Sequence, residues 1–500
     1  MRLCAGSSSV VQTDAPANKR LLTATEGLQG FASRFVNEKA VPSDAVAAVI
    51  AELSEALELV NAEIGLPTAL LDMVWARIGD AAAVAARSET LDERATDVLG
   101  RALLACASGD APRPAENADD TFTVPAWSPA ARNAAAQGLP RLLRHRTDDE
   151  MVAALRVLAT DPAPSVRYLL ALELPRLVPK HEGSFWELAD LYAAQEWNRV
   201  VQQALGRALM AVASTDREER VLRTLDQLLE RVPLADTQRS LPNEDQVGGL
   251  IVGLAVARRN ERAMARLDAA LRNVPPPYLS TLVFHLMHYV GYNWIADPKR
   301  RGMAEAALGW LPQIIERVNR SLRDEVDRAR AGDSDSGEAI RELFDVLEHI
   351  ISRFYFQSGI HEGQGVQHAS REEICLFFGT IRPILRQLGE ITGGTSGFGL
   401  PARTAHHLIQ LLRGSIACDP AEVLRLTRLA IDGARGAGYA FDPMAAQEVT
   451  AIVETMLADH REAVRVGQSL DDLMRVLDAF VQAGWPEAQR LVWRLEELFR

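Results

Sequence analysis

Apolar residues recur along most of the chain at steps of three and four positions, which is the spacing of one helix face. In Asp44–Val60 this stripe is Val46, Val49, Ile50, Leu53, Leu57 and Val60. Comparable stripes occupy Met151–Leu158, Val166–Leu177, Val221–Leu229, Ile340–Ile351, Ile374–Leu388 and Leu470–Phe480. The alternation typical of strands is nearly absent, and its best short example is Thr121–Val124. The pattern therefore predicts an all-α chain.

Prolines mark several of the boundaries between stripes. Four Asp-Pro pairs lie there, namely Asp161-Pro162, Asp297-Pro298, Asp419-Pro420 and Asp442-Pro443. An aspartate can accept the free amide hydrogens of a first helical turn, and a proline at the first helical position has no such hydrogen. Each pair therefore predicts a helix start. Pro383, inside Ile374–Leu388, predicts a kink or a break.

Two helical segments match each other at an offset of 35 residues. Pro129-Ala-Ala-Arg132 is followed by Leu139-Pro140-Arg141-Leu142, and Pro164-Ser-Val-Arg167 is followed by Leu174-Pro175-Arg176-Leu177. A weaker copy comes 32 residues later, with Arg199 and Leu209 in register. A period of this size is typical of stacked helical hairpins.

The segment Asp161-Pro-Ala-Pro-Ser-Val166-Arg167 resembles the HEAT-repeat family. In that family an aspartate and an arginine six positions apart stack between adjacent hairpins, so the resemblance gives Asp161 and Arg167 a structural role. Arg132 holds the place of Arg167 in the preceding copy, but Ala126 stands six residues before it. The match covers about residues 121–209. The same Asp-to-Arg spacing returns at Asp419–Arg425 and Asp459–Arg465.

These observations predict an α-solenoid, a superhelix of stacked antiparallel helical hairpins of HEAT or armadillo-like type. Because neighbouring hairpins supply each other's core, such arrays present long binding surfaces. The expected organisation is a flexible leader at 1–20, an N-terminal helical region at 21–108, a polar linker at 109–120 and HEAT-like repeats at 121–500.

The charge balance limits the partners that the chain can bind. Its 500 residues contain 54 basic and 67 acidic side chains, a net charge of −13, which disfavours a chain-wide electrostatic grip on nucleic acid or anionic lipid. A local basic patch is still compatible with this balance. Only Lys19, Lys39, Lys180 and Lys299 are lysines, a bias typical of a GC-rich bacterial genome.

The four cysteines, Cys4, Cys106, Cys375 and Cys418, lie far apart without a CxxC pair. This spacing argues against a disulfide framework and a cysteine-rich zinc site, and it favours a reduced cytoplasm. Cys375, beside Phe377 and Phe378, is expected to be a buried thiol.

Val274–Ala296 has no Asp, Glu, Lys or Arg and is long enough to span a bilayer. It nevertheless opens with three prolines and contains His285, His288, Gly291 and Asn293. This polarity favours a buried solenoid helix over a membrane helix, so no membrane partner is expected.

Candidate metal ligands are few. His285 and His288 lie one helical turn apart, and His361 and His368 flank a glycine-bearing loop. A metal site needs three or four converging ligands, so these histidines are weak candidates, and neither a cofactor motif nor a catalytic motif is present.

The best candidate binding surface combines aromatic and basic residues. It consists of Tyr289, Tyr292, Trp294, Lys299, Arg300 and Arg301, which the fold could join to Arg258, Arg259 and Arg262. A solvated helix end would explain the basic cluster equally well.

The sequence thus favours a non-enzymatic scaffold or sensor arm that binds another protein and works beside a separate effector such as an NTPase. Two alternatives stay open. One is a nucleic-acid-binding HEAT-like protein, and the other is a metal-dependent enzyme with a histidine site.

Overall fold

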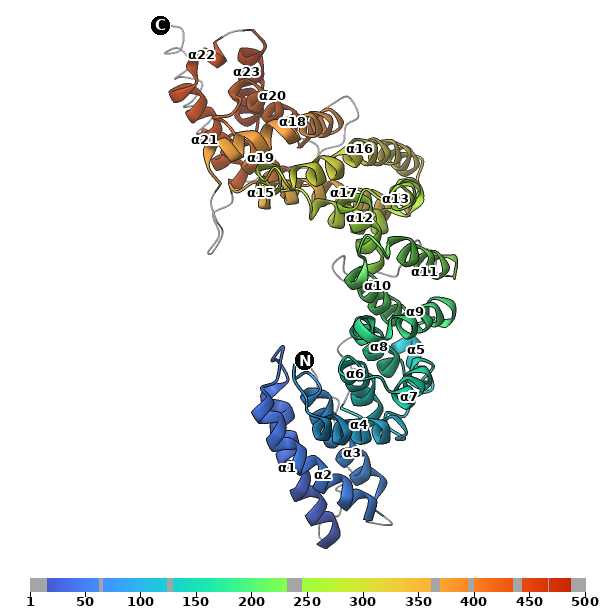
Figure 1. Ribbon diagram of the computed structural model, residues 1–500. Helices are drawn as coiled ribbons and strands as arrows, with labels where there is room; N and C mark the ends of the chain where they lie inside the picture. The colour runs from blue at the N-terminus through green and yellow to red at the C-terminus, as the bar shows by residue number, and fades with distance from the viewer. Residues whose placement is uncertain are drawn as a thin grey trace. The chain divides into compact units, whose positions relative to one another are not determined.

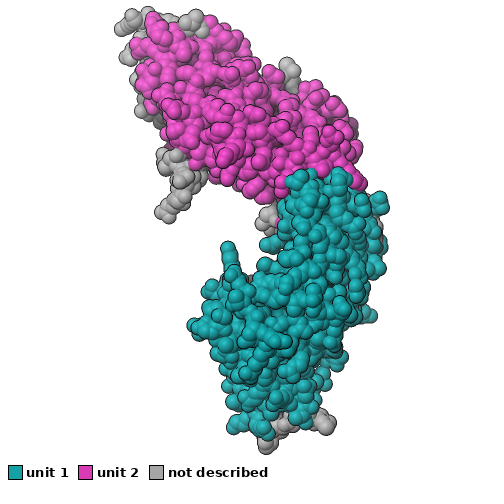
Figure 2. All heavy atoms as spheres, in the orientation of Figure 1, with its two compact units in different colours: residues 1–233 teal, residues 234–500 magenta. Residues whose placement is uncertain are grey.

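The structure is a computed structural model that describes residues 16–62, 66–123, 129–231, 245–360, 369–393, 400–434, 443–465 and 467–486. Helices joined by turns and short connections make up these ranges, and none of them contains a strand. The chain divides into two compact units, residues 1–233 and 234–500 (Figure 2). The predicted all-α class is confirmed.

Unit 1 contains α1 (Pro16–Phe35), α2 (Ser43–Ala62), α3 (Thr68–Ala85), α4 (Glu93–Ala107), α5 (Ala118–Thr121), α6 (Ala131–Leu143), α7 (Asp149–Ala159), α8 (Pro164–Glu173), the 3-10 helix η1 (Leu174–Leu177), α9 (Val178–Gln195), α10 (Arg199–Val212) and α11 (Glu218–Arg231). Helices α1, α3, α6, α8 and α10 pack in succession as one layer (Figure 1). Helices α2, α4, α7, α9 and α11 form the second layer, so each helical hairpin contributes to both.

Unit 2 contains α12 (Gln246–Ala257), α13 (Glu261–Asn273), α14 (Pro276–Met287), α15 (Tyr292–Ala296), α16 (Arg301–Arg330), α17 (Ser336–Phe356), α18 (Arg371–Gly393), α19 (Ala402–Gly414), α20 (Pro420–Ala434), α21 (Pro443–Asp459), α22 (Arg461–Val464) and α23 (Gln468–Gln482). One layer is α12, α14, α17, α19 and α21, and the other is α13, α16, α18, α20 and α23. Each unit is thus an α-solenoid of stacked antiparallel hairpins, as predicted.

The core follows the predicted apolar stripes. All six stripe residues of the Asp44–Val60 segment are buried on α2. Close helix packing also requires small residues. A Cβ on Gly138 of α6 would lie 2.5 Å from the side chain of Leu103 and 3.1 Å from the backbone of Ala83, so a larger residue there would force both neighbours to shift.

Some local expectations need correction. Pro383 lies within the continuous helix α18 and does not split it, and Thr121 ends helix α5 instead of beginning a strand. Among the Asp-Pro pairs, Pro420 and Pro443 begin helices as predicted, whereas α8 and α16 begin two or more residues after theirs. Helix α1 begins inside the expected leader, and the expected linker 109–120 lies within unit 1.

The uncharged segment Val274–Ala296 contains two short helices, α14 and α15, separated by a turn. The side chains of Tyr278, Leu279 and Leu282 on α14 are buried. In the part of the chain that the structure describes, no helix combines the length and apolar character needed to cross a membrane.

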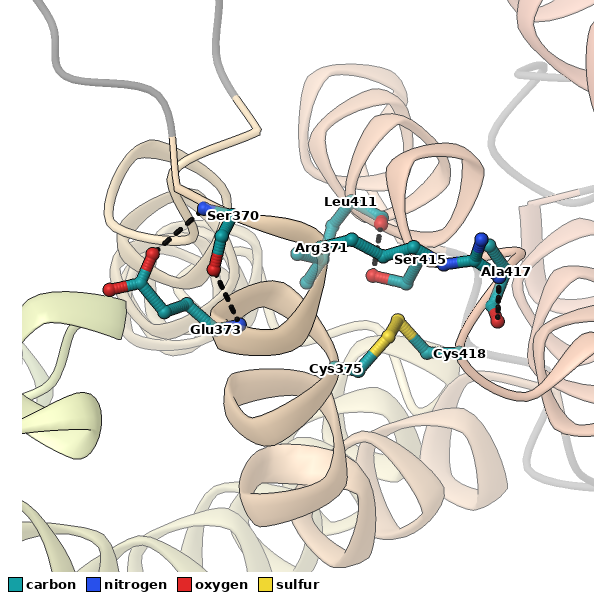
Figure 3. Close-up of a disulfide and its surroundings, with 8 residues drawn as sticks. All are labelled: Ser370, Arg371, Glu373, Cys375, Leu411, Ser415, Ala417 and Cys418. Atoms are coloured by element: carbon teal, nitrogen blue, oxygen red, sulfur yellow. Dashed lines mark hydrogen bonds between the residues drawn. A yellow bond between two sulfur atoms is a disulfide. The ribbon is translucent and has the colours of Figure 1, made fainter.

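A disulfide joins Cys375 of α18 to Cys418, which precedes α20, with their Cα atoms 5.0 Å apart (Figure 3). The first turn of α18 is held by reciprocal hydrogen bonds between Ser370 and Glu373, and Arg371 donates to the carbonyl of Ala417 at 3.2 Å. The prediction that Cys375 is a buried thiol is wrong, because both bonded cysteines are half-buried. The sequence argument against disulfides therefore fails for this pair, while Cys106 is free and buried.

We predict that Cys375→Ser together with Cys418→Ser lowers the free energy of unfolding of unit 2 by about 2–4 kcal/mol. The physical reason is that a bond closing a 43-residue separation restricts the unfolded chain. Urea unfolding followed by circular dichroism, without reductant, measures the change. A reductant should bring the wild-type protein to the stability of the variant, and equal stabilities before reduction would contradict the prediction.

Asp80 of α3 is a half-buried ionisable group in unit 1. Burial raises its pKa to about 6. Burial, followed by the charge of Asp80, raises the pKa of the Cys106 thiol above its usual range. Because the folded state binds a proton at Asp80 more readily than the unfolded state, stability falls as the pH rises from about 4 to about 6.

We predict that Asp80→Asn raises the free energy of unfolding at pH 7.5 by about 2 kcal/mol, because the amide removes the cost of burying a carboxylate. Urea unfolding at a series of pH values should show the two proteins converging below about pH 4. Asp72→Asn, on the same helix, is the control. Asp72 pairs with Arg113 at 3.1 Å, so losing its charge should not stabilise the protein.

Candidate binding surface

An ion-pair ladder connects successive hairpins of unit 1. Arg132 donates to Asp161 at 2.7 Å, and Arg167 donates to Glu196 at 2.7 Å. Both pairs span 29 residues, so each arginine binds the carboxylate that precedes the next helix of its layer. Arg167 also donates to the main-chain carbonyl of Asp161 at 2.6 Å. The structure therefore brings Asp161, Arg167 and Arg132 together between hairpins.

The ladder is buried and almost fully hydrogen-bonded. Arg132 also donates to the carbonyls of Gly109 and Pro112, and Asp161 accepts from the amide of Ala163. Burial alone would lower the pKa of Arg167, but the hydrogen bonds and charges of Glu196 and Asp119 raise it. These hydrogen bonds link each hairpin of this part of unit 1 to the next one.

We predict that Asp161→Ala lowers the free energy of unfolding by about 3 kcal/mol, because it leaves Arg132 nearly buried without its carboxylate. Urea unfolding measures the loss, and adding Arg132→Met should recover part of it.

The matched control is Asp97→Ala, which removes an exposed partner of Arg146 and should cost less than about 1 kcal/mol. Equal losses for Asp161→Ala and Asp97→Ala would show that the ladder does not stabilise the stack.

The predicted histidine ligands do not assemble a metal site where the structure describes them. His285 lies on α14 with its Nε2 atom 4.0 Å from a carboxylate oxygen of Asp245, which already accepts from the hydroxyl of Tyr278 at 2.7 Å. His288, at the end of α14, contacts aromatic rings. No group of three potential metal ligands occurs in the described ranges, and His361 and His368 lie outside them.

Aromatic and cationic side chains meet at the turn between α14 and α15. The rings of Tyr289 and Trp294 are 5.3 Å apart in an edge-to-face arrangement, and His288 is 5.6 Å from Tyr289. The guanidinium of Arg300 lies over the ring of Trp294 at 5.2 Å. Tyr289 and Trp294 are half-buried, whereas His288 and Arg300 are exposed. We call these four residues the Trp294 surface.

Two further arginines, Arg259 and Arg301, make contacts at the start of α16. Arg259 donates to the carbonyl of Gly302 at 3.2 Å, so the end of α12 meets this helix, as the sequence suggested. Arg301 donates to the carbonyl of Ile295 at 2.8 Å, which ties α16 to α15. Lys299 and Arg258 are exposed, as are Arg259 and Arg262.

Tyr292, at the start of α15, contacts the segment that follows α17. Its main-chain amide donates to the carbonyl of Gln357 at 2.9 Å, and its ring lies against Gly359. The structure therefore groups Tyr289 and Trp294 with Arg300.

Sequence reasoning missed two members of these clusters. Glu196 was not recognised as the partner of Arg167, although it stands 29 residues after it, as Asp161 does after Arg132. His288 was considered only as a metal ligand, because the sequence does not show which residues share a turn.

Comparison with known proteins adds little to this picture. No family model matches the chain, and no curated protein matches it in sequence. Among solved structures, an engineered protein from a structural genomics consortium has 14% identity and a TM-score of 0.26, covering 94% of this chain and 97% of the other. APUM23-GGAUUUGACGG has 13% identity and a TM-score of 0.22, covering 96% of each chain. At these scores neither likeness bears on function.

Proposed function

We propose that this chain is a non-enzymatic scaffold whose Trp294 surface binds an acidic segment of a partner protein. The observation that carries the proposal is the exposed guanidinium of Arg300 over the half-buried ring of Trp294. Tryptophan and arginine are the residues that most often dominate the energy of protein interfaces.

Charge complementarity selects the kind of partner. Arg300 forms an ion pair with Asp297 at 3.4 Å, but the exposed Lys299 and Arg259 add positive charge at the start of α16. The chain as a whole carries −13. A basic patch on an acidic protein attracts an acidic segment to one place and repels it elsewhere.

The hairpin type is part of the same proposal. The Asp161-to-Arg167 spacing and the contact of Arg167 with the Asp161 carbonyl support HEAT-type repeats. We further propose that the scaffold works beside a separate effector, such as an NTPase, and that it acts in the cytoplasm. In a reducing cytoplasm Cys375 and Cys418 would be kept as thiols, whereas an oxidising compartment would preserve their disulfide. Trapping thiols in intact cells with an alkylating reagent would test the location.

Nucleic-acid binding is the second candidate function, and the same cluster supports it. Half-buried aromatic rings beside an arginine can stack on nucleobases while nearby cations contact phosphates. The net charge of −13 weighs against a long electrostatic footprint, so a short single strand is the form to test.

We predict that a fluorescent Asp/Glu-rich peptide containing one phenylalanine binds the full chain and that Trp294→Ala weakens binding at least about tenfold. The reason is that truncating a central interface tryptophan costs about 2 kcal/mol or more. Fluorescence anisotropy gives the dissociation constants, and Arg300→Ala should act in the same direction.

Arg330→Ala is the matched control for Arg300→Ala. Both arginines pair with an aspartate three residues earlier and lie at opposite ends of α16, with 53% and 71% of the side chain exposed. A twelve-residue single-stranded RNA serves as the competing probe. Tighter binding of RNA, lost in Trp294→Ala, would replace the scaffold with the nucleic-acid function, and binding unaffected by Trp294→Ala would reject this surface.

A further inference from the structure

A cavity of about 520 Å³ opens in unit 1 where the carboxyl ends of α1, α3 and α6 meet the 3-10 helix η1. Five cationic side chains line it, together with Glu38, Glu89 and Ala40. The cations are Lys39, Arg87, Arg141, Arg144 and Arg176. This arginine pocket is separate from the Trp294 surface, which belongs to unit 2.

Main-chain carbonyls hold two of the arginines in place. Nη1 of Arg87 donates to the carbonyls of Phe35, Val36 and Glu38, at the end of α1. Arg144 donates through Nη2 to the carbonyls of Arg87 and Ser88, at the end of α3. Nη2 of Arg87 and Nη1 of Arg144 make no hydrogen bond to the residues that the structure describes. The guanidinium groups are therefore fixed while keeping donors available.

The other two arginines come from the repeated Leu-Pro-Arg-Leu motif. Arg141 donates to Glu173, and Nε of Arg176 lies 3.6 Å from the second carboxylate oxygen of Glu173. One carboxylate thus serves both arginines. In the 35-residue register, Gly138 stands where Glu173 stands in the next copy, and a Cβ there would lie 2.5 Å from the side chain of Leu103.

Positive charge therefore exceeds negative charge in the pocket. Five cations face three carboxylates, those of Glu38, Glu89 and Glu173. Burial, and then the charge of Arg141, lowers the pKa of Arg87. Burial, and then the charge of Arg176, lowers the pKa of Arg144. Burial is the larger cause for both arginines and the neighbouring cations add to it, so a bound anion would favour their charged forms.

We propose that the arginine pocket binds a phosphate group, either free phosphate or a phosphomonoester on a larger molecule. A doubly charged anion matches the excess of two cations. A guanidinium group can donate two parallel hydrogen bonds to two oxygens of one phosphate. This geometry favours phosphate over an anion that accepts only one hydrogen bond. The cavity is larger than one phosphate and open, so it also accepts a phosphorylated side chain.

Isothermal titration of the full chain with inorganic phosphate, and with a phosphoserine peptide beside its unphosphorylated form, tests the proposal. Arg176 is the residue to change, because it makes no hydrogen bond to a described residue and 56% of its side chain is exposed. Arg176→Gln should weaken phosphate binding about tenfold or more, and Arg176→Glu should abolish it. Phosphate should also raise the unfolding temperature relative to chloride at equal ionic strength.

Arg113→Gln is the matched control, because Arg113 is 57% exposed in the same unit and also pairs with one carboxylate. A phosphoserine peptide that binds more tightly than phosphate identifies a phosphorylated partner as the source, and equal affinities identify free phosphate. The proposal is overturned if neither probe binds saturably, if Arg176→Glu binds like the wild type, or if acetate binds as tightly as phosphate.

Discussion

The stack of unit 1 depends on satisfying polar groups where helices end between hairpins. An unpaired polar group in such a place costs about 1–3 kcal/mol, which opposes the stabilisation that the buried apolar stripes provide. Charged side chains of the following hairpin meet this need at two places. Arg132 and Arg167 bind carboxylates before the next helices, while Arg87 and Arg144 bind carbonyls at the ends of the preceding ones. In unit 1 the same arginine contacts therefore both join successive hairpins and satisfy the polar groups between them.

This constraint also explains why the proposed binding sites lie where hairpins meet. An arginine that caps a helix end is held in one conformation by the carbonyls, and its unused donors are then positioned without further loss of side-chain entropy. In unit 2 the short helix α15 has an analogous effect. It interrupts the regular hairpin pattern. The turn before it places Tyr289 beside Trp294, and the guanidinium of Arg300 lies over the Trp294 ring. The short helix thus brings together aromatic and cationic side chains at one turn of unit 2.

The helices could be predicted from the sequence because their signal is local. The six apolar positions of α2 and the proline starts of α20 and α21 follow from periodicity and capping. Contacts between hairpins could not be predicted in the same way. Glu196 finds Arg167 because of the superhelical offset, and Cys375 finds Cys418 because α18 packs beside α20. The Leu-Pro-Arg-Leu motif shows the limit, since it is α-helical in α6 and 3-10 in η1.

The disulfide of unit 2 has a topological consequence. It makes residues 375–418 a closed covalent ring that contains most of α18 and all of α19. A single peptide-bond cleavage anywhere inside this ring opens the backbone without separating the two fragments, which stay joined through sulfur. The hairpin can therefore survive a nick as one covalent molecule, and its fragments part only when the sulfur bond is reduced.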